Sequence, residues 1–162
     1  MDFSLPPPTR YAPGERETIE RVREEHAMLV STDAIAAMFG VVTAPIAVIN
    51  EKRQIVHANR SLLRMAGCSS VEDVLGMRLG EAMGCVHATE DLSGCGTHPS
   101  CTVCGTVNAA LCALNGRPCV AEVNLSVERA GQQQAFNFDL HAEPLTIRGR
   151  LFALLKVETI ED

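Results

Sequence analysis

The order of strand-like and helix-like segments is the feature that most limits the fold of this chain. Two short apolar runs separated by a polar turn at 50–53 predict a β-hairpin. Three longer strand-like runs lie near the end, with turns indicated at Gly131 and at Arg148-Gly149. The predicted strands are 46–49, 54–58, 119–127, 135–143 and 151–157. Because these strands do not alternate with helices, we expect an α+β domain built on a five-stranded antiparallel sheet.

Short helical segments precede the first strand and separate the two groups of strands. Segment 15–30 is rich in charge and carries an apolar stripe, and Ser31-Thr32-Asp33 indicates a break before a second helix. The predicted helices are 15–30, 34–39, 61–66, 71–75 and 101–114, with Asn59 and Ser100 as N-caps. The chain therefore divides into a proline-rich flexible stretch at 1–14, an N-terminal helical segment at 15–39 and a domain at 40–162.

Composition and charge exclude several classes of function. A chain of 162 residues with 46% hydrophobic residues is large enough for one domain with a sizeable core. Its formal net charge of -6, with no local Lys/Arg cluster, argues against nucleic-acid binding. The start lacks a signal-peptide pattern, and Gly40 and Pro45 interrupt the longest uncharged run. We expect a cytoplasmic domain without membrane contact.

Four of the seven cysteines lie in a glycine-rich stretch at about 80–105. Cys101 and Cys104 form a Cys-x-x-Cys pair at the predicted start of a helix, where the positive end of the helix dipole stabilises thiolates. Cys95 lies between two glycines and Cys85 follows one, which lets the backbone approach a cofactor closely. These four cysteines are the candidate ligands of a metal centre, and their number suits zinc and an iron–sulfur cluster equally.

The spacing of these cysteines favours the cluster. Structural zinc sites favour paired Cys-x-x-Cys motifs. Here only one such pair is present, since nine residues separate Cys85 from Cys95 and five separate Cys95 from Cys101. A larger cluster, 4Fe-4S or 2Fe-2S, has corners that lie further apart. Zinc is the alternative, and a redox disulfide between Cys101 and Cys104 is another, although it leaves the other two cysteines unexplained. Ordinary buried thiols are the remaining interpretation.

The other cysteines and the nearby histidines receive different predictions. Cys112 and Cys119 are expected in the core, and Cys68 follows a glycine at a helix end. His87 and His98 flank the ligand segment and are expected to hydrogen-bond a backbone group or a cluster sulfur. No catalytic triad order, phosphate-binding loop or pair of acids stands out, so we assign no catalytic residues and expect no enzyme.

The sequence resembles PAS domains at both ends of the predicted sheet. The hairpin Ile49-Asn50-Glu51-Lys52-Arg53-Gln54-Ile55-Val56-His57-Ala58-Asn59 resembles the first PAS hairpin, and 157–162 is similar to the Asp-Ile-Thr ending, with Glu158 replacing the Asp. Segments 80–88, 94–97 and 101–105 resemble a cysteine-rich, iron–sulfur-binding subgroup found in bacterial sensory proteins. The resemblance covers about 15–162 and implies a PAS fold with short helices on one face and an N-terminal flanking helix.

The resemblance implies a sensor, because many such domains are input domains of histidine kinases in two-component systems. We expect a redox or oxygen sensor that signals to a kinase or another partner, since a cluster responds to oxidants. With zinc, the domain would instead be a zinc-stabilised dimerisation module. The resemblance also favours a homodimer through the N-terminal helix, whose apolar stripe is Ile19, Val22, His26 and Leu29. The stripe equally suits a helix that covers the edge of its own domain.

Overall fold

The computed structural model describes residues 12–88, 94–98, 100–101 and 104–159, so most of the predicted flexible stretch at 1–14 lies outside the described residues. Its centre is an antiparallel sheet of five strands in the order β2-β1-β5-β4-β3. The strands are β1 (Ile46–Ile49), β2 (Ile55–Ala58), β3 (Cys119–Arg129), β4 (Gln132–Ile147) and β5 (Arg150–Thr159). The prediction of a five-stranded antiparallel sheet is confirmed.

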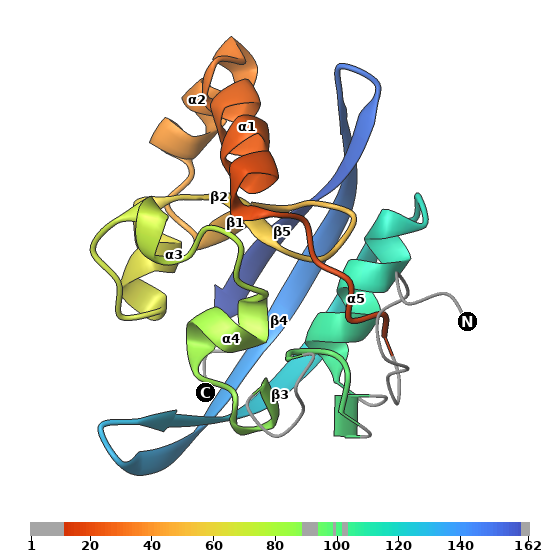
Figure 1. Ribbon diagram of the computed structural model, residues 1–162. Helices are drawn as coiled ribbons and strands as arrows, with labels where there is room; N and C mark the ends of the chain where they lie inside the picture. The colour runs from red at the N-terminus through yellow and green to blue at the C-terminus, as the bar shows by residue number, and fades with distance from the viewer. Residues whose placement is uncertain (1–11, 89–93, 99, 102–103, 160–162) are drawn as a thin grey trace.

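Helices pack on both faces of this sheet. In Figure 1, α1 and α2 stand near β1 and β2, whereas α4 and α5 flank the long strands lower in the view. The α-helices are α1 (Ile19–Val30), α2 (Asp33–Val41), α3 (Arg60–Met65), α4 (Leu79–Met83) and α5 (Gly105–Leu114). Two single 3₁₀ turns, η1 (Val71–Asp73) and η2 (Val86–Ala88), lie on either side of α4 in sequence. The layout agrees with the expected short helices on one face and N-terminal flanking helix.

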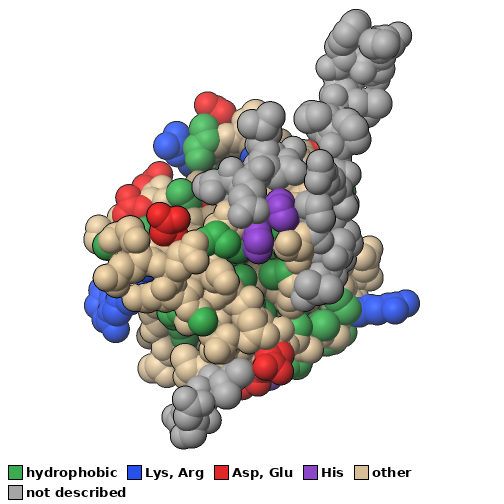
Figure 2. Space-filling view, turned by 90° about the horizontal axis from the view of Figure 1, so that it is seen from below, with side chains coloured by type: hydrophobic (Ala, Val, Ile, Leu, Met, Phe, Trp, Pro, Cys, Tyr) green, Lys and Arg blue, Asp and Glu red, His purple; other side chains and the backbone are tan. Residues whose placement is uncertain are grey.

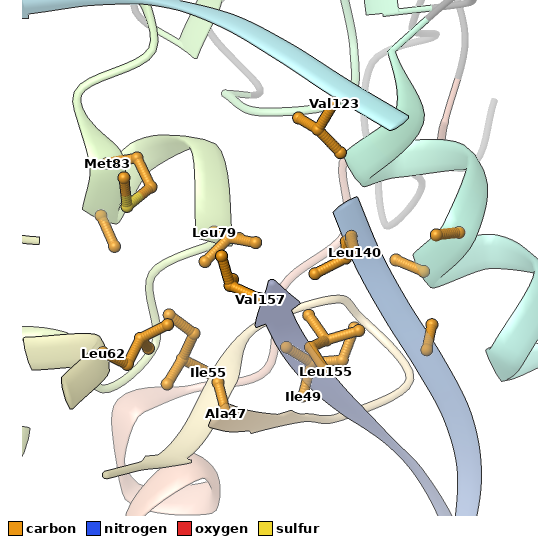
Figure 3. Close-up of a cluster of buried hydrophobic side chains, with 14 of the residues drawn as sticks. Ala47, Ile49, Ile55, Leu62, Leu79, Met83, Val123, Leu140, Leu155 and Val157 are labelled. Carbon is orange, nitrogen blue, oxygen red and sulfur yellow. The ribbon is translucent and has the colours of Figure 1, made fainter. Parts of the chain in front are cut away.

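The main core lies between the sheet and α3, α4 and α5. Figure 3 shows Leu62 from α3 and Leu79 and Met83 from α4 among side chains of the strands, including Leu155 and Val157 of β5. All five side chains are at most 4% exposed. The core is aliphatic, and burial of such side chains stabilises the fold by about 1.5–3 kcal/mol each. This packing fixes α4 and α5, the two helices from which the cysteine segments extend.

The other face of the sheet buries the apolar stripe of α1. Val22 and Leu29 are fully buried in a second cluster formed with side chains of β1, β2 and β5. Between them, the carboxylate of Glu25 accepts hydrogen bonds from Asn50 Nδ2 and from the Arg150 guanidinium, both at 3.1 Å. The stripe therefore packs against its own domain. This agrees with the interpretation of the sequence in which the helix covers the edge of its own domain.

The helix before β3 begins later than the sequence predicts. We expected it to start at Cys101 with Ser100 as N-cap, but α5 starts at Gly105 and Cys104 is its N-cap, with an extended backbone at φ −78° and ψ 120°. The Cys104 N–H instead donates to the Cys101 carbonyl at 3.1 Å. A side chain at Gly105 would collide with the backbone oxygen of Glu122, so the glycine lets α5 approach β3 closely.

Candidate metal centre

Four cysteines line one cavity of about 210 Å³ at the junction of α4, η2, α5 and β3. Cys85 follows α4, Cys95 lies in the described segment 94–98, and Cys101 and Cys104 precede α5. The cavity is also lined by Gly80, His87, Thr106, Val107, Asn124 and Ser126, among others. The structure thus brings the four candidate ligands, which are spread over 20 residues of sequence, to one place.

Backbone contacts fix Cys85 at the end of α4. Gly84 ends the helix with a left-handed backbone at φ 82°, and its carbonyl accepts from the Glu128 N–H at 3.0 Å. The Cys85 N–H donates to the carbonyl of Gly80 at 2.8 Å, and Cys85 forms a bridge with Val127 of β3. The sulfur accepts hydrogen bonds from backbone N–H groups of η2. Cys85 is therefore oriented by both α4 and the sheet.

Cys95 is held by charged groups on both sides of its peptide unit. Its N–H donates to the Glu81 carboxylate at 3.0 Å, and its carbonyl accepts from Arg53 at 2.9 Å and from Arg78 at 3.3 Å. The side chain is packed against Gly80, where an added Cβ would lie 2.6 Å from the Cys95 sulfur. A larger residue at position 80 would therefore occupy the space beside the sulfur.

The electrostatics of the cavity disfavour free thiolates. Burial raises the pKa of Cys95 to about 12, and burial also raises the pKa of Cys85. Hydrogen bonds from backbone N–H groups lower both values, whereas neighbouring cysteines raise them, because like charges repel at short range. Deprotonating several of these thiols together therefore requires positive charge inside or beside the cavity, which a bound metal would supply.

Two buried guanidinium groups provide positive charge next to Cys95. Arg78 is 1% exposed and Arg53 is 5% exposed. Burial and the nearby Arg53 lower the pKa of Arg78 to about 9, while Glu81 and Cys95 act in the opposite direction. Burial lowers the pKa of Arg53 as well. A long cationic side chain is rarely buried to this extent unless nearby groups bind its charge, because desolvation of a charge is costly.

These arginines also reach the segment that leads into α1. Arg53 donates to the Pro13 carbonyl at 2.6 Å, and Arg78 donates to the Glu15 carbonyl at 2.8 Å. The Ala12 N–H in turn donates to the Gly96 carbonyl at 3.0 Å. Segment 12–17, called here the N-terminal strap, is thereby attached directly to the loop that carries Cys95.

Glu81 anchors the same region from the side of α4. It forms an ion pair with Arg16 of the strap and accepts from the N–H of Arg78 at 3.0 Å as well as from Cys95. Burial opposes ionisation of Glu81, but the hydrogen bonds from Arg16 and the two backbone N–H groups lower its pKa overall. It therefore stays ionised and joins strap, helix and cysteine loop.

The two histidines near the cysteines lie against one another. The rings of His87 and His98 stack with centroids 4.7 Å apart, and His98 Nδ1 accepts from the Ser100 N–H at 3.0 Å. His87 also lines the cavity. Figure 2 shows two adjacent histidine side chains on the lower face of the molecule, with hydrophobic side chains beside them. Of the two, only His87 is among the residues that line the cavity, and a contact of either ring with a cluster stays a prediction.

The cysteine side chains are not gathered tightly. Among the described residues, no three His, Cys, Asp or Glu side chains lie close enough together to bind a single metal ion. The four cysteines are nevertheless free thiols that line one cavity, two of them buried and two partly exposed. Thiolates, backbone N–H groups directed at sulfur and nearby cations are the groups that surround iron–sulfur clusters.

The charged residues of this site were not predicted from the sequence. Arg53 belongs to a polar turn and Arg78 and Glu81 flank a glycine, so each has the sequence context of a solvent-exposed residue. Local periodicity carries no signal for their burial, because much of the burial arises from contacts between segments that are far apart in the sequence. Arg53 also has a positive φ of 67° in the turn of the first hairpin, and the sequence does not indicate this conformation.

Comparisons with known proteins agree with the fold. Residues 34–98 match the family model of the PAS domain. No curated protein sequence matches the chain. Among solved structures, the PAS domain of nitrogen regulation protein NR(II) from Vibrio parahaemolyticus has a TM-score of 0.53 at 15% identity, covering 77% of this chain and 96% of that one. The PAS domain of an HTR-like protein from Haloarcula marismortui has a TM-score of 0.53 at 15% identity, with coverages of 85% and 98%.

A PAS domain from a two-component sensor histidine kinase is a further neighbour, with a TM-score of 0.50, 11% identity and coverages of 81% and 97%. The family match and the five-stranded sheet together confirm the prediction that this chain contains a PAS domain. Within the described ranges, none of the helices has the length and apolar character needed to cross a bilayer.

Proposed function

We propose that this PAS domain is a cytoplasmic, non-enzymatic redox or oxygen sensor that holds an iron–sulfur cluster through Cys85, Cys95, Cys101 and Cys104. The observation that carries the proposal is the convergence of these four residues on one cavity. They reach it from three separate segments whose backbones are fixed by α4, by charged hydrogen bonds and by the start of α5.

The openness of the cysteine arrangement favours a cluster over zinc. Four sulfurs on one zinc ion lie about 3.8 Å apart, given a Zn–S distance of about 2.3 Å and tetrahedral geometry. Among the described residues, no three such side chains are grouped so as to hold one metal ion, although the four cysteines line one cavity of about 210 Å³. Zinc would need the surrounding segments to close inward. A zinc-stabilised module therefore remains the weaker alternative.

Charge compensation supports the same assignment. A cluster held by four thiolates carries net negative charge, and its potential depends on nearby charges and on hydrogen bonds to the sulfurs. Arg53 and Arg78 are buried beside Cys95, and backbone N–H groups donate to the sulfurs of Cys85 and Cys95. A simple thiol–disulfide function of Cys101 and Cys104 would not require buried cations next to a third cysteine.

The contacts of the N-terminal strap provide a route for the signal. A bound cluster supplies a charge that changes on oxidation. The Cys95 carbonyl shares Arg53 and Arg78 with the carbonyls of Pro13 and Glu15. A shift of the Cys95 loop therefore changes the hydrogen bonds of the strap, which continues directly into α1. We propose that α1 transmits this change to a histidine kinase or another signalling partner, as the kinase neighbours suggest.

A homodimer through α1 belongs to the same proposal. Val22 and Leu29 are buried against the sheet and are not available, but Ile19 is 39% exposed and Val30 is 43% exposed on the same helix. These two residues would form the contact. Sedimentation of Ile19→Asp and Val30→Asp variants tests it, because both should dissociate a dimer that uses this surface, and a wild-type chain that sediments as a monomer would contradict it.

The sensor function is tested on protein purified without oxygen. The expected result is a brown protein whose visible absorption bleaches on exposure to air and returns after anaerobic treatment with iron, sulfide and a thiol reductant. Hydrogen exchange of the strap should change in parallel with the absorption. A visible spectrum that is absent from the start, or strap exchange that does not respond to bleaching, would contradict the proposal.

A further inference from the structure

A second pair of cysteines lies at the far end of α5, outside the cavity. Cys112 is in the last turn of the helix and Cys119 is the first residue of β3. The Cys112 thiol lies near enough to raise the pKa of Cys119. Both are free thiols and partly exposed to solvent. The proposed metal centre uses neither of them.

The turn between α5 and β3 determines this proximity. Asn115 ends the helix, and the N–H of Arg117 donates back to the Cys112 carbonyl at 3.1 Å. Gly116 supplies the left-handed backbone, at φ 87°, that reverses the chain. Cys119 then enters the sheet opposite Ala142 of β4. The two thiols are therefore placed together by a helix end and a strand start that are both anchored in the fold.

We propose that Cys112 and Cys119 are a reversible dithiol–disulfide site that reacts with low-molecular-weight disulfides such as oxidised glutathione. In the first step a Cys112 thiolate attacks one sulfur of the oxidant, which forms a mixed disulfide and releases one glutathione thiolate. In the second step Cys119 attacks the Cys112 sulfur, closes the intramolecular disulfide and releases the second glutathione thiolate. The two cysteine protons pass to the two released thiolates, and two electrons reduce the oxidant.

The local environment assigns the order of attack. Burial raises the pKa of the Cys119 thiol, and the neighbouring Cys112 raises it further. We assign the attacking sulfur to Cys112, in the last turn of α5, and the resolving sulfur to Cys119. Cys112 also lies on a helix surface beside the exposed residues Asn115 and Gly116, where a small disulfide can approach it.

A disulfide at this position would fasten α5 to β3. The opposite end of α5 begins at Cys104, which lines the cysteine cavity. Oxidation at one end of the helix would therefore restrict the element that carries a cavity cysteine at the other end. The site would respond to thiol–disulfide balance, and its chemistry does not require metal in the cavity.

The test exposes the full reduced chain to oxidised glutathione without oxygen, and then blocks remaining thiols and maps disulfides by peptide mass. We expect a peptide pair linked through Cys112 and Cys119, which dithiothreitol reverses. In Cys119→Ser, Cys112 should instead retain a glutathione adduct, whereas Cys68→Ser should form the linked pair as wild type does. Cys119→Ala repeats the first variant if the serine disturbs folding, with circular dichroism as the check.

The proposal is overturned if Cys112 and Cys119 are both recovered with the blocking label after glutathione treatment, or if either one pairs instead with a cavity cysteine. Iron, sulfide and zinc are measured on the same samples. A linked pair in protein without metal would support this site while contradicting the metal centre, so the two proposals can fail separately.

Discussion

Arg53 donates a hydrogen bond from one guanidinium nitrogen to the carbonyl oxygen of Cys95, at 2.9 Å. Its other terminal nitrogen donates to the Pro13 carbonyl, so one buried cation joins the cysteine loop to the N-terminal strap. Gly96 makes this possible, because a side chain there would collide with the Arg53 guanidinium. Arg53 therefore connects the cysteine loop of the candidate metal centre directly to the strap that precedes α1.

Replacing Arg53 by Gln should release the strap. A hydrogen bond from a charged group contributes about 1.5–3 kcal/mol, so the protected amides of Ala12 and Glu17 should exchange at least about tenfold faster. Those amides donate to Gly96 and to the Gln54 side chain. Hydrogen exchange read by mass spectrometry or NMR measures this. The matched control is Arg117→Gln at an exposed position, and equal exchange in both variants would show that Arg53 does not hold the strap.

Serine at any of the four cavity cysteines should remove a thiolate and lower the metal content strongly, while far-UV circular dichroism of the sheet is retained. Serine at Cys68, Cys112 or Cys119 should leave the metal content unchanged, because none of these lines the cavity. Metal analysis of the seven variants, purified in parallel, measures the difference. If both groups contain the same amount of metal, the ligand assignment is wrong.

Gly80→Ala tests the space beside the Cys95 sulfur without touching a ligand. The new methyl group would lie 2.6 Å from that sulfur, so the sulfur must move. We expect metal affinity to fall by about tenfold, the scale of changes next to metal ligands, and overpacking to cost about 1–3 kcal/mol of stability. Gly40→Ala is the control, because nothing lies within 4 Å of its added carbon. Unchanged metal affinity in Gly80→Ala would contradict the position of the site.

His57 should make the folded state sensitive to mild acid. Its ring stacks on Phe39 and its Nδ1 atom is buried without a hydrogen-bond partner among the described residues. Burial, and then the neighbouring His26, lower its pKa from 6.5 to about 4. The unfolded chain therefore binds a proton more readily, and stability present above about pH 6.5 is lost as the pH falls towards 4.

The expected loss is about 1–2 kcal/mol, because partial exposure of the ring reduces the effect. His57→Phe keeps an aromatic ring on Phe39 but cannot bind a proton. Urea unfolding of wild type and variant at several pH values between 7 and 4 measures the difference in slope. Parallel stability curves for the two proteins would show that His57 does not carry this dependence.

The fold was predictable because strand periodicity and turn glycines are local signals. Gly131 and Gly149 mark the two long hairpins in the sequence and have positive φ in the structure. The grouping of the cysteines was also visible, since four of them lie close together in sequence. The start of α5 was wrong by one turn, because the extended backbone of Cys104 depends on its contact with Cys101 and on the packing of Gly105 against β3.

The charged surroundings of the site could not be predicted in the same way. The burial of Arg53 and Arg78 depends on contacts with segments 40 and 63 residues away. The contact between Cys112 and Cys119 depends on how α5 ends and on the register of β3. Cys119 packs against the core as predicted, whereas Cys112 is partly exposed and belongs to none of the core clusters of the described residues. Long-range contacts of this kind leave no periodic pattern in a single sequence.

Quantitative analysis of iron, acid-labile sulfide and zinc in anaerobically purified wild-type protein is the decisive measurement for the iron–sulfur centre. We expect iron and sulfide in equal amounts, about two or about four of each per chain, with little zinc. About one zinc per chain without sulfide, or no metal in protein that is folded and has reduced cysteines, would contradict it.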